Sequence, residues 1–337
     1  MDEAPAARYF AQLVDYVEAS GIPCRDALSA AQIRTLNDPQ ARLTMAQVDA
    51  LLRELVRLTA RTDLAFELGK LIKLNSHDVL GYALISCPTV DHVLRLVARY
   101  YRIISPMFTF RYERHGDTAD IAMVPVLGMS EHTLHFHIEA AAVSFHQQIE
   151  SVIQGKVSGD YVLSMPAPAH AARYRELLPA RFQFGPESLP GVRIRLVTDS
   201  FDAPLAMTDL RALDQAEARC KQLMQECSVG GKWGDWVRML LMKAEDCQPT
   251  LDELASIVNL SARTLDRYLA REGTNLRALK LEVRDERARE MLGEGRLAIS
   301  QIAYRLGYTD IANFSRAFKR ENGVSPSAFV DQLRGAK

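Results

Sequence analysis

A short stretch near the C-terminus decides how the second half of the chain folds: "GYTDIANFSRAFKRENGVSP", residues 307–326. If its centre is wound as a helix at 100° per residue, two faces of different chemistry appear. Apolar side chains share one arc, which predicts a core face: Ile311, Phe314, Ala317 and Phe318. Small and cationic side chains share the other arc: Ala312, Ser315, Arg316 and Lys319, with Arg320 at its edge. The pattern therefore predicts a helix that is anchored by phenylalanines and presents its cations together.

The residues that flank this helix predict where it begins and ends. Thr309 is a side-chain cap for the N-terminus. Gly323 stands where a left-handed residue closes the C-terminus, and Ser325 and Pro326 then begin a further helix. Because the residues between the cations are small, the cationic face can approach a surface closely. The groove of duplex DNA is an anionic surface that suits such a face.

This unit has a near-copy upstream. The segment "LDELASIVNLSARTLDRYLAREG" (251–273) matches "ISQIAYRLGYTDIANFSRAFKRENG" (299–323) with an offset of 48 to 50 residues. Each copy predicts a short helix, a tight turn and a second helix, which is the helix-turn-helix arrangement. In the first copy Arg263, Asp266 and Arg267 point outward. A helix over 277–292 holds the units apart, so that two recognition helices about 34 Å from each other can enter successive major grooves.

The first part of the chain predicts a different architecture. Residues 1–105 show apolar residues at helical spacing, as in "TMAQVDALLRELVRLTAR" (44–61) with Thr44 as its cap. Farther on the period changes to two, and five short strands are expected around a helix over 131–153. The strands are "FTFRYER" (108–114), "ADIAMVPV" (119–126), "DYVLSM" (160–165), "ARFQFG" (180–185) and "VRIRLV" (192–197). We predict an α+β fold with a small, mostly antiparallel sheet that is not a jelly roll, followed by an all-α region with two helix-turn-helix units.

The Gly-rich segment "CSVGGKWGD" (227–235) separates these regions. We expect an N-terminal domain over 1–228, a linker over 229–235 and a double helix-turn-helix DNA-binding domain over 236–337. The net charge of the 337 residues is only −1, and the part from residue 231 onward carries 18 Lys or Arg against 15 Asp or Glu. A function in DNA binding therefore depends on where the cations lie, not on their number.

Composition excludes several classes of protein. With 48% hydrophobic and 25% charged residues, the chain has the profile of an ordinary globular protein. The longest uncharged apolar stretch, 79–90, is about half of a membrane span, and the start is acidic, so we expect a cytoplasmic location. Five cysteines without C-x-x-C spacing indicate reduced thiols rather than a disulfide framework or a zinc site.

Two further patterns concern partners of the N-terminal domain. A helix over 205–228 places apolar residues at steps of three and four, which is typical of a short coiled-coil seam and favours a homodimer: Leu213, Ala216, Cys220, Leu223 and Cys227. The alternative is that this helix packs on its own domain. Other side chains are candidates for an effector pocket, although most of them would also serve simply to pack the domain: Tyr82, Tyr101, Phe108, Phe110 and His135.

The C-terminal stretch "ISQIAYRLGYTDIANFSRAFKRENGVSPSAF" resembles the signature of AraC/XylS-type transcriptional regulators over about 250–330. Segments such as "LGYALISCPTVDHVLRLVARYY" and "DAPLAMTD" resemble the arabinose-binding-type domain of the ornithine-utilisation-regulator type. The resemblance implies a bacterial DNA-binding regulator, an activator that contacts RNA polymerase, with an N-terminal effector-sensing and dimerisation domain. By position it implies base-contacting roles for Arg263, Asp266, Arg267, Ala312, Ser315 and Arg316, beside the cations Lys319 and Arg320.

Two alternatives stay open. Clustered histidines in "EHTLHFHIEAAAVSFH" (131–146) suggest a metal- or haem-binding sensor or enzyme that uses His132, His135 and His137, but their spacing matches no strong metal motif. The chain also lacks a phosphate-binding loop and a G-x-S-x-G motif, so we expect no cofactor and no enzymatic activity. The second alternative is a DNA-binding regulator that has no small-molecule effector.

Overall fold

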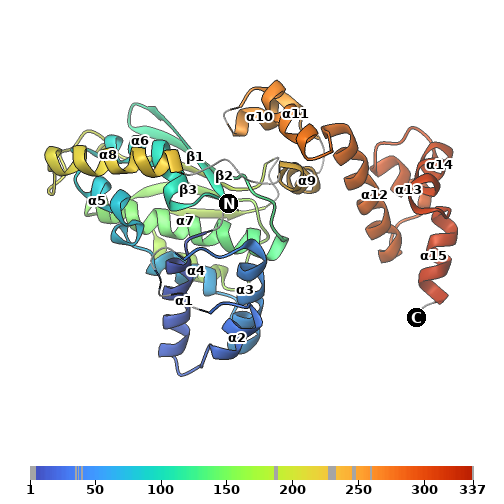
Figure 1. The fold of residues 1–337 in the computed structure, drawn as a ribbon, viewed down its shortest axis with the longest axis horizontal. Helices are drawn as coiled ribbons and strands as arrows, with labels where there is room; N and C mark the ends of the chain where they lie inside the picture. Colours follow the sequence, from blue (N-terminus) through green and yellow to red (C-terminus); the bar gives the residue numbers. More distant parts are fainter. Residues whose placement is uncertain are drawn as a thin grey trace.

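The computed structural model describes residues 5–34, 36, 38, 41–185, 189–226, 233–244, 248–258 and 260–335. Helices form the first 105 residues, as expected (Figure 1). They are α1 (Ala7–Ala19), α2 (Arg25–Ala30), α3 (Met45–Thr59), α4 (Leu64–Leu71), the 3₁₀ helix η1 (Leu74–His77), α5 (Val79–Ile85) and α6 (Val90–Ile104). The side chain of Thr44 caps α3 by accepting from the Gln47 amide at 3.2 Å, which confirms the predicted cap.

Five strands form one mixed sheet in the order β1-β2-β5-β3-β4. Their bounds are β1 (Phe108–His115), β2 (Thr118–Pro125), β3 (Ser158–Leu163), β4 (Arg181–Phe184) and β5 (Val192–Val197). All pairs are antiparallel except β3 with β4. The register places buried residues beside one another, such as Phe110 beside Met123 and Ile121 beside Ile194, whereas the other face carries charged side chains. The predicted α+β class and the small, mostly antiparallel sheet are confirmed.

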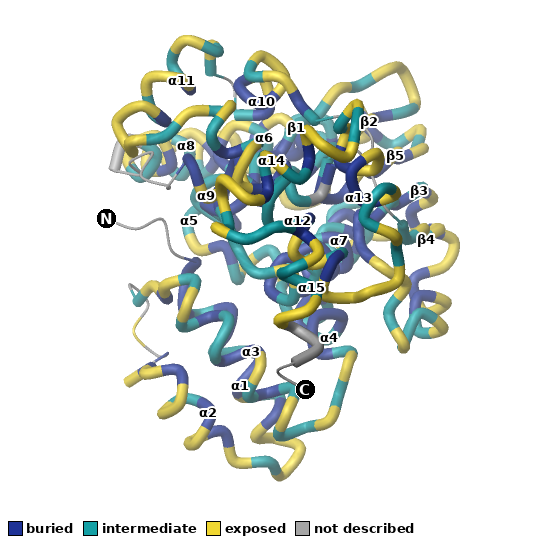
Figure 2. The backbone as a smooth tube through the Cα atoms, turned by 90° about the vertical axis from the view of Figure 1, so that its right-hand side faces the viewer, coloured by how far each residue is buried: buried dark blue, intermediate teal, exposed yellow. Residues whose placement is uncertain are grey.

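The long helix α7 (Glu131–Ile153) lies between two hydrophobic clusters. On one side Phe136 and Ala140 join the cluster formed by α1–α4. On the other side Leu134, Ile138 and Ala142 join the cluster formed by the sheet and α6. Because α7 is buried on both sides, its apolar residues are not confined to one face of the helix. Figure 2 shows the buried stripes of α1 and α3 in dark blue.

The C-terminal region is entirely helical within its described residues. It contains α9 (Trp233–Lys243), α10 (Leu251–Ile257), α11 (Ala262–Arg271), α12 (Leu276–Glu294), α13 (Ile299–Arg305), α14 (Ile311–Asn322) and α15 (Pro326–Gly335). The pairs α10–α11 and α13–α14 are the two helix-turn-helix units, and α12 runs between them (Figure 1). Both units and the connecting helix lie where the sequence predicts them. On α12 the apolar side chain of Leu281 is 40% exposed.

Helix α9 joins the two halves of the molecule. The predicted linker, 229–235, lies largely outside the described residues, and its last three residues from Trp233 form the first turn of α9. Trp236 is fully buried, and its indole Nε1 donates to the Pro125 carbonyl at the end of β2 at 2.7 Å. The backbone of Gly128 comes so close to α9 that a Cβ there would lie 2.8 Å from the Asp235 Cβ. Helix α9 is therefore docked on the N-terminal domain.

The first helix-turn-helix unit shares its core with that domain, and the second does not. Leu265 and Leu269 of α11 belong to the same buried cluster as the sheet and α9. Phe314 and Phe318 of α14 belong to a separate cluster with α13 and the end of α12. One unit is thus continuous with the N-terminal domain, and the other extends from it through α12.

Candidate nucleic-acid interface and ligand cavity

Helix α14 is closed at both ends. Asp310, not Thr309, is its N-cap, and the Asp310 carboxylate accepts from the Asn313 amide at 2.6 Å. A carboxylate at this position satisfies a free amide and also interacts favourably with the helix dipole. At the other end Gly323 has φ 75° and ψ −17°, which confirms the predicted left-handed cap. The helix therefore has a defined length and orientation against α13.

Replacing Gly323 with valine is expected to destabilise the second unit. No heavy atom lies within 4 Å of an added Cβ, so the cost comes from φ alone. A left-handed backbone costs a residue with a side chain roughly 1–2 kcal/mol, and more for a β-branched one. Hydrogen exchange of α13–α15 should speed up in Gly323→Val and change little in Gly323→Asn, because asparagine tolerates this conformation. Equal protection in the wild type and the valine variant would show that the cap does not limit stability.

The two faces of α14 separate largely as predicted. Phe314 and Phe318 are buried, whereas Ala312, Arg316, Lys319 and Arg320 are exposed and Ser315 is half-buried. Ile311 is 42% exposed, so its assignment to the core face is wrong. It lies in the first turn, ahead of the point where α14 meets its neighbours. The exposed side of α14 thus carries a larger apolar contact surface than the sequence suggests.

Sequence reasoning missed Asn313. The Arg316 guanidinium donates to the Asn313 Oδ1 at 2.5 Å, and the Asn313 side-chain nitrogen donates to Asp310. These contacts orient the guanidinium on the exposed side of the helix. Asparagine is the side chain that pairs with adenine in the major groove, and arginine is the one that pairs with guanine. Its position two residues into a capped helix is the sequence signal that points to Asn313.

Helix α11 has the same design in the first unit. Ser261 caps its N-terminus, and Leu265 and Leu269 are fully buried. The predicted contact residues Arg263, Asp266 and Arg267 are all exposed, and α11 lies at the top of Figure 2 with its exposed turns in yellow. No ion pair joins Asp266 to Arg263 among the described residues, so the exposed carboxylate is free to accept from a base amino group such as that of cytosine.

The C-terminal end of α11 packs against α9. Both oxygens of the Glu272 carboxylate accept backbone amides at 2.8 Å, from Trp233 and Gly234. The Trp233 ring also stacks on Tyr268 at 5.5 Å, and the Arg267 guanidinium lies 5.8 Å from the centre of the Tyr268 ring. Helix α9 therefore contacts α11 through Glu272 and Tyr268, and Tyr268 lies beside Arg267.

The predicted dimer seam on α8 (Leu210–Glu226) lies against the protein's own α5 and α6. Leu213 is 4% exposed and Cys220 is fully buried, and Ala216 packs beside them. Leu223 is half-buried, and Cys227 lies outside the described residues. The arrangement matches the alternative in which this helix packs on its own domain.

The histidines of α7 do not converge. The His135 ring lies 3.7 Å from Glu131, and the His137 Nδ1 donates to the Thr133 carbonyl at 2.7 Å. The His132 Nε2 is buried and has no hydrogen-bond partner within the described ranges. In the described part of the chain, no three side chains of His, Cys, Asp or Glu are placed to hold a metal ion. His132 and His135 are three apart and share a face, but His137 is two residues beyond His135 and points in another direction, so the three rings cannot converge on one ion.

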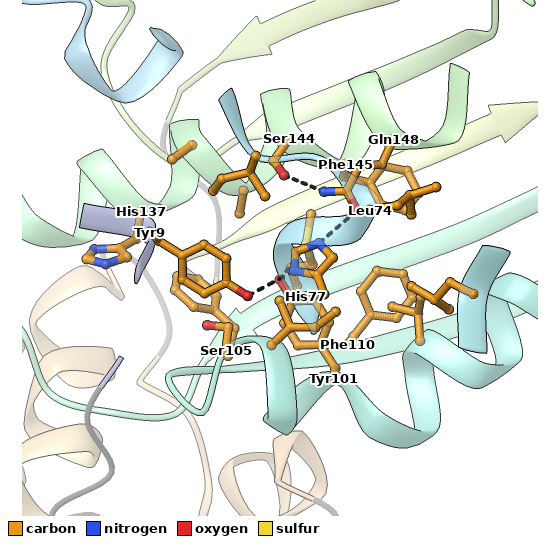
Figure 3. Close-up of a pocket in the computed structure, with 18 of the residues that line it drawn as sticks. Tyr9, Leu74, His77, Tyr101, Ser105, Phe110, His137, Ser144, Phe145 and Gln148 are labelled. Atoms are coloured by element: carbon orange, nitrogen blue, oxygen red, sulfur yellow. Dashed lines mark hydrogen bonds between the residues drawn. The ribbon is translucent and has the colours of Figure 1, made fainter. Parts of the chain in front are cut away.

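A cavity of about 130 Å³ lies between α1, α6, α7 and strands β1 and β2 (Figure 3). Three of the five predicted effector residues line it: Tyr101, Phe108 and Phe110. The other two do not, because Tyr82 is 66% exposed on α5 and His135 lies on a different face of α7. Sequence reasoning missed Tyr9, His77 and Gln148, which come from three separate segments.

These missed residues form a directed chain of hydrogen bonds, drawn as dashed lines in Figure 3. The Gln148 side-chain nitrogen donates to the Ser144 hydroxyl at 2.6 Å, which leaves its oxygen to accept from His77 Nε2 at 2.8 Å. His77 Nδ1 is then an acceptor, and the Tyr9 hydroxyl donates to it at 2.9 Å. Burial lowers the pKa of His77 to about 4, so the ring is neutral at pH 7.

Stability is expected to fall as the pH drops from about 6.5 to 4. The folded protein disfavours a proton on His77, whereas the unfolded chain takes one up near the ordinary pKa of 6.5, so acid favours unfolding in this range. The loss at pH 5 is about 2 kcal/mol from this residue. Urea unfolding at pH 7.5 and pH 5 measures it. In His77→Gln the difference should shrink, but in His115→Gln, where the histidine is on the surface, it should not. A pH profile that His77→Gln leaves unchanged would contradict this assignment.

Comparison with known proteins agrees with this geometry. The family model described as the arabinose-binding domain of AraC transcription regulators matches residues 21–189, half of the chain, and a helix-turn-helix model matches 254–332. The HTH-type transcriptional regulator Rv1395 of Mycobacterium tuberculosis is 28% identical, over 94% of this chain and 93% of its own length. The ornithine utilization regulator of Pseudomonas aeruginosa is 25% identical, over 95% and 94%.

Among solved structures, the transcriptional regulator CdpR from Pseudomonas aeruginosa matches 91% of this chain and 96% of its own, with 24% identity and a TM-score of 0.43. No helix in the described ranges combines the length and the apolar character needed to cross a bilayer. The relatives and the family models are those of transcription regulators rather than of enzymes. The chain belongs to the AraC family of DNA-binding transcription regulators.

Proposed function

We propose that this regulator binds its operator by inserting α11 and α14 into successive major grooves on one face of the duplex. The observation that supports this most directly is that both helices bury their apolar side and expose an arginine at matching positions, Arg267 and Arg316. The connecting helix α12 has 19 residues, hence a length of about 28 Å, which is comparable with one turn of DNA. Each unit would then read one half-box.

Selection of bound fragments from genomic DNA at about 150 mM salt tests this function. The expected result is a motif with two half-boxes about one helical turn apart. A motif with a single box would mean that only one unit reads bases. Fragments without any shared motif, recovered by folded protein, would overturn sequence-specific binding by these helices.

We also infer that a small molecule in the N-terminal domain modulates DNA binding. The support is a continuous path of contacts. Met123 lines the cavity, and two residues farther along β2 the Pro125 carbonyl accepts from Trp236. Trp236 packs edge-on against Trp233 at 5.6 Å, which stacks on Tyr268 of α11. A ligand that moves the end of β2 would therefore move the first recognition helix.

Three further properties follow from the family resemblance: a homodimer, transcription activation and contact with RNA polymerase. We infer that a dimer would use a surface other than the Leu213–Cys220 side of α8, because that side is occupied within one chain. Sedimentation of the purified protein checks the first property, and transcription in vitro from a selected operator checks the other two. A protein that regulates chromosomal genes acts in the bacterial cytoplasm.

A further inference from the structure

We propose that the cavity between α1, α6, α7 and the sheet binds an uncharged, largely apolar molecule of about one six-membered ring that carries a single hydrogen-bonding oxygen, as a phenol does. This inference rests on the proposed role of the N-terminal domain and specifies the chemistry of its effector. It departs from the family description, since a sugar or a charged amino acid is the kind of molecule that this cavity disfavours.

Size is the first observation. The cavity volume is about 130 Å³. An apolar protein cavity of roughly 150 Å³ is enough to hold benzene. The walls include the rings of Phe108, Phe110 and Phe145, and the Phe110 ring lies 5.2 Å from Tyr101 and 5.9 Å from Phe145. Aromatic walls at these separations make edge and face contacts with a further ring.

Charge is the second observation. Among the described residues that line the cavity there is no Asp, Glu, Lys or Arg. Its two histidines, His77 and His137, are both neutral, because burial lowers each pKa to about 4. The nearby Arg8 guanidinium, 5.2 Å from the centre of the Tyr9 ring, is not part of the lining and is paired with Asp78 at 4.0 Å. A carboxylate or an ammonium group would therefore be buried without a counter-charge in the wall itself, and this burial costs more free energy than the apolar contacts supply. The cavity therefore selects against charged ligands.

Hydrogen bonding is the third observation. Among the described residues, the Tyr101 hydroxyl donates only to the Met123 sulphur at 3.4 Å, a weak acceptor that a ligand oxygen can replace at little cost in free energy. The Tyr9 hydroxyl donates its hydrogen bond to His77, so the Tyr9 oxygen can still accept a hydrogen bond from a ligand hydroxyl. The His137 Nε2 is a further acceptor in the wall, buried without a hydrogen-bond partner among the described residues, and Ser105 adds a hydroxyl, but most of the lining is aliphatic or aromatic. A pentose with four hydroxyls would leave most of them unpaired in an apolar wall.

A surface hollow next to the cavity suggests a route by which a ligand enters, and the charges along it agree with selection of an uncharged ligand. Leu74 and Gln148 line both the cavity and a neighbouring surface hollow that contains Lys73 and Lys156. Lys156 is paired with Glu150 at 3.0 Å. The charged groups thus lie outside, beyond Leu74 and Gln148, and the apolar part of the ligand lies inside.

Calorimetry and thermal shift on the full-length protein test the proposal. The probes are phenol, benzene, cyclohexanol, benzoate, L-arabinose and ornithine, with hexanol and hexanoate as a matched pair. Phenol and cyclohexanol at 10 mM should raise Tm by about 2 °C, and arabinose, ornithine and benzoate should not. Binding of arabinose or ornithine, binding of no uncharged ring, or a preference for hexanoate over hexanol would each overturn the proposal.

Two variants locate the site. Tyr101→Phe keeps the shape of the cavity and removes the hydroxyl donor. Phenol binding should therefore weaken about 10-fold while benzene binding is unchanged. Ala141→Leu fills the cavity and should abolish both. If Ala141→Leu fails to fold, Tyr101→Phe alone decides, because equal losses for phenol and benzene would contradict the assigned contact. DNA binding is measured separately. If bound phenol does not change the affinity for the operator, the proposed effector role is wrong, whereas the proposed chemistry of the ligand is unaffected.

Discussion

Simultaneous replacement of Arg267 and Arg316 with alanine is expected to lower affinity for the selected operator by about 30-fold to 10⁴-fold. Each arginine lies on the exposed side of a recognition helix, and a bidentate contact with a base contributes about 1–3 kcal/mol. The sites are on helices with separate cores, so the two losses should add. Titration of labelled operator by fluorescence anisotropy at fixed salt measures the change.

The matched control is Arg53→Ala/Arg57→Ala, which removes the same charge from the exposed side of α3 in the N-terminal domain. It should leave operator binding within about twofold. Affinity for random DNA distinguishes the role of the two arginines, because a base contact affects the operator more than random sequence. An equal loss on both kinds of DNA would assign Arg267 and Arg316 to the phosphates. For Lys319→Ala that equal loss is the expected outcome.

Trp236→Ala is expected to destabilise the protein by about 3–5 kcal/mol. The side chain is fully buried between α9 and the end of β2, and truncation of a buried tryptophan leaves a cavity. Trp236→Phe should cost less, about 1–3 kcal/mol, since it keeps the packing and strands the Pro125 carbonyl. The chain has two tryptophans, both in α9, so the fluorescence of Trp233 during urea unfolding reports on this contact directly.

The same variants test how the two halves communicate. If α9 transmits the state of the cavity to α11, Trp236→Phe should reduce the change in operator affinity that a ligand produces, while ligand binding itself is kept. A phenylalanine variant that is as stable as the wild type and responds fully to ligand would show that the Trp236–Pro125 contact is neither structural nor part of the coupling. His137→Gln is a useful comparison, since it alters the cavity wall and not α9.

Sequence reasoning succeeded where the determining contacts are local. The Thr44 cap of α3, the left-handed Gly323 and the alternation of strands β1 and β2 each depend on residues within a few positions of one another. It erred by one residue at the start of α14, where both Thr309 and Asp310 are competent caps and the path of the preceding turn selects the second. The exposed arginines of α11 and α14 were likewise readable from helical periodicity.

The cavity and the docking of α9 could not be predicted from local sequence patterns. Tyr9, His77 and Gln148 meet from three distant segments, and none has a distinctive spacing. The Gly-rich segment before α9 suggests separation of the domains, yet Trp236 is buried against residue 125, 111 positions away in the chain. Contacts between such distant residues depend on how the helices and the sheet pack together in the complete chain.

By itself, then, the amino-acid sequence determined the class of each element, the double helix-turn-helix and the exposed arginines of the recognition helices, because side-chain periodicity and end caps act over one or two turns. Only the tertiary structure decided which apolar faces meet. It turned the α8 seam inward, joined the first DNA-binding unit to the sheet through Trp236, and left a space of about 130 Å³ where α1, α6 and α7 converge. The physical reason is that the hydrophobic effect is non-directional. It favours the burial of an apolar face against any apolar surface, and the packing of the complete chain selects which surface that is.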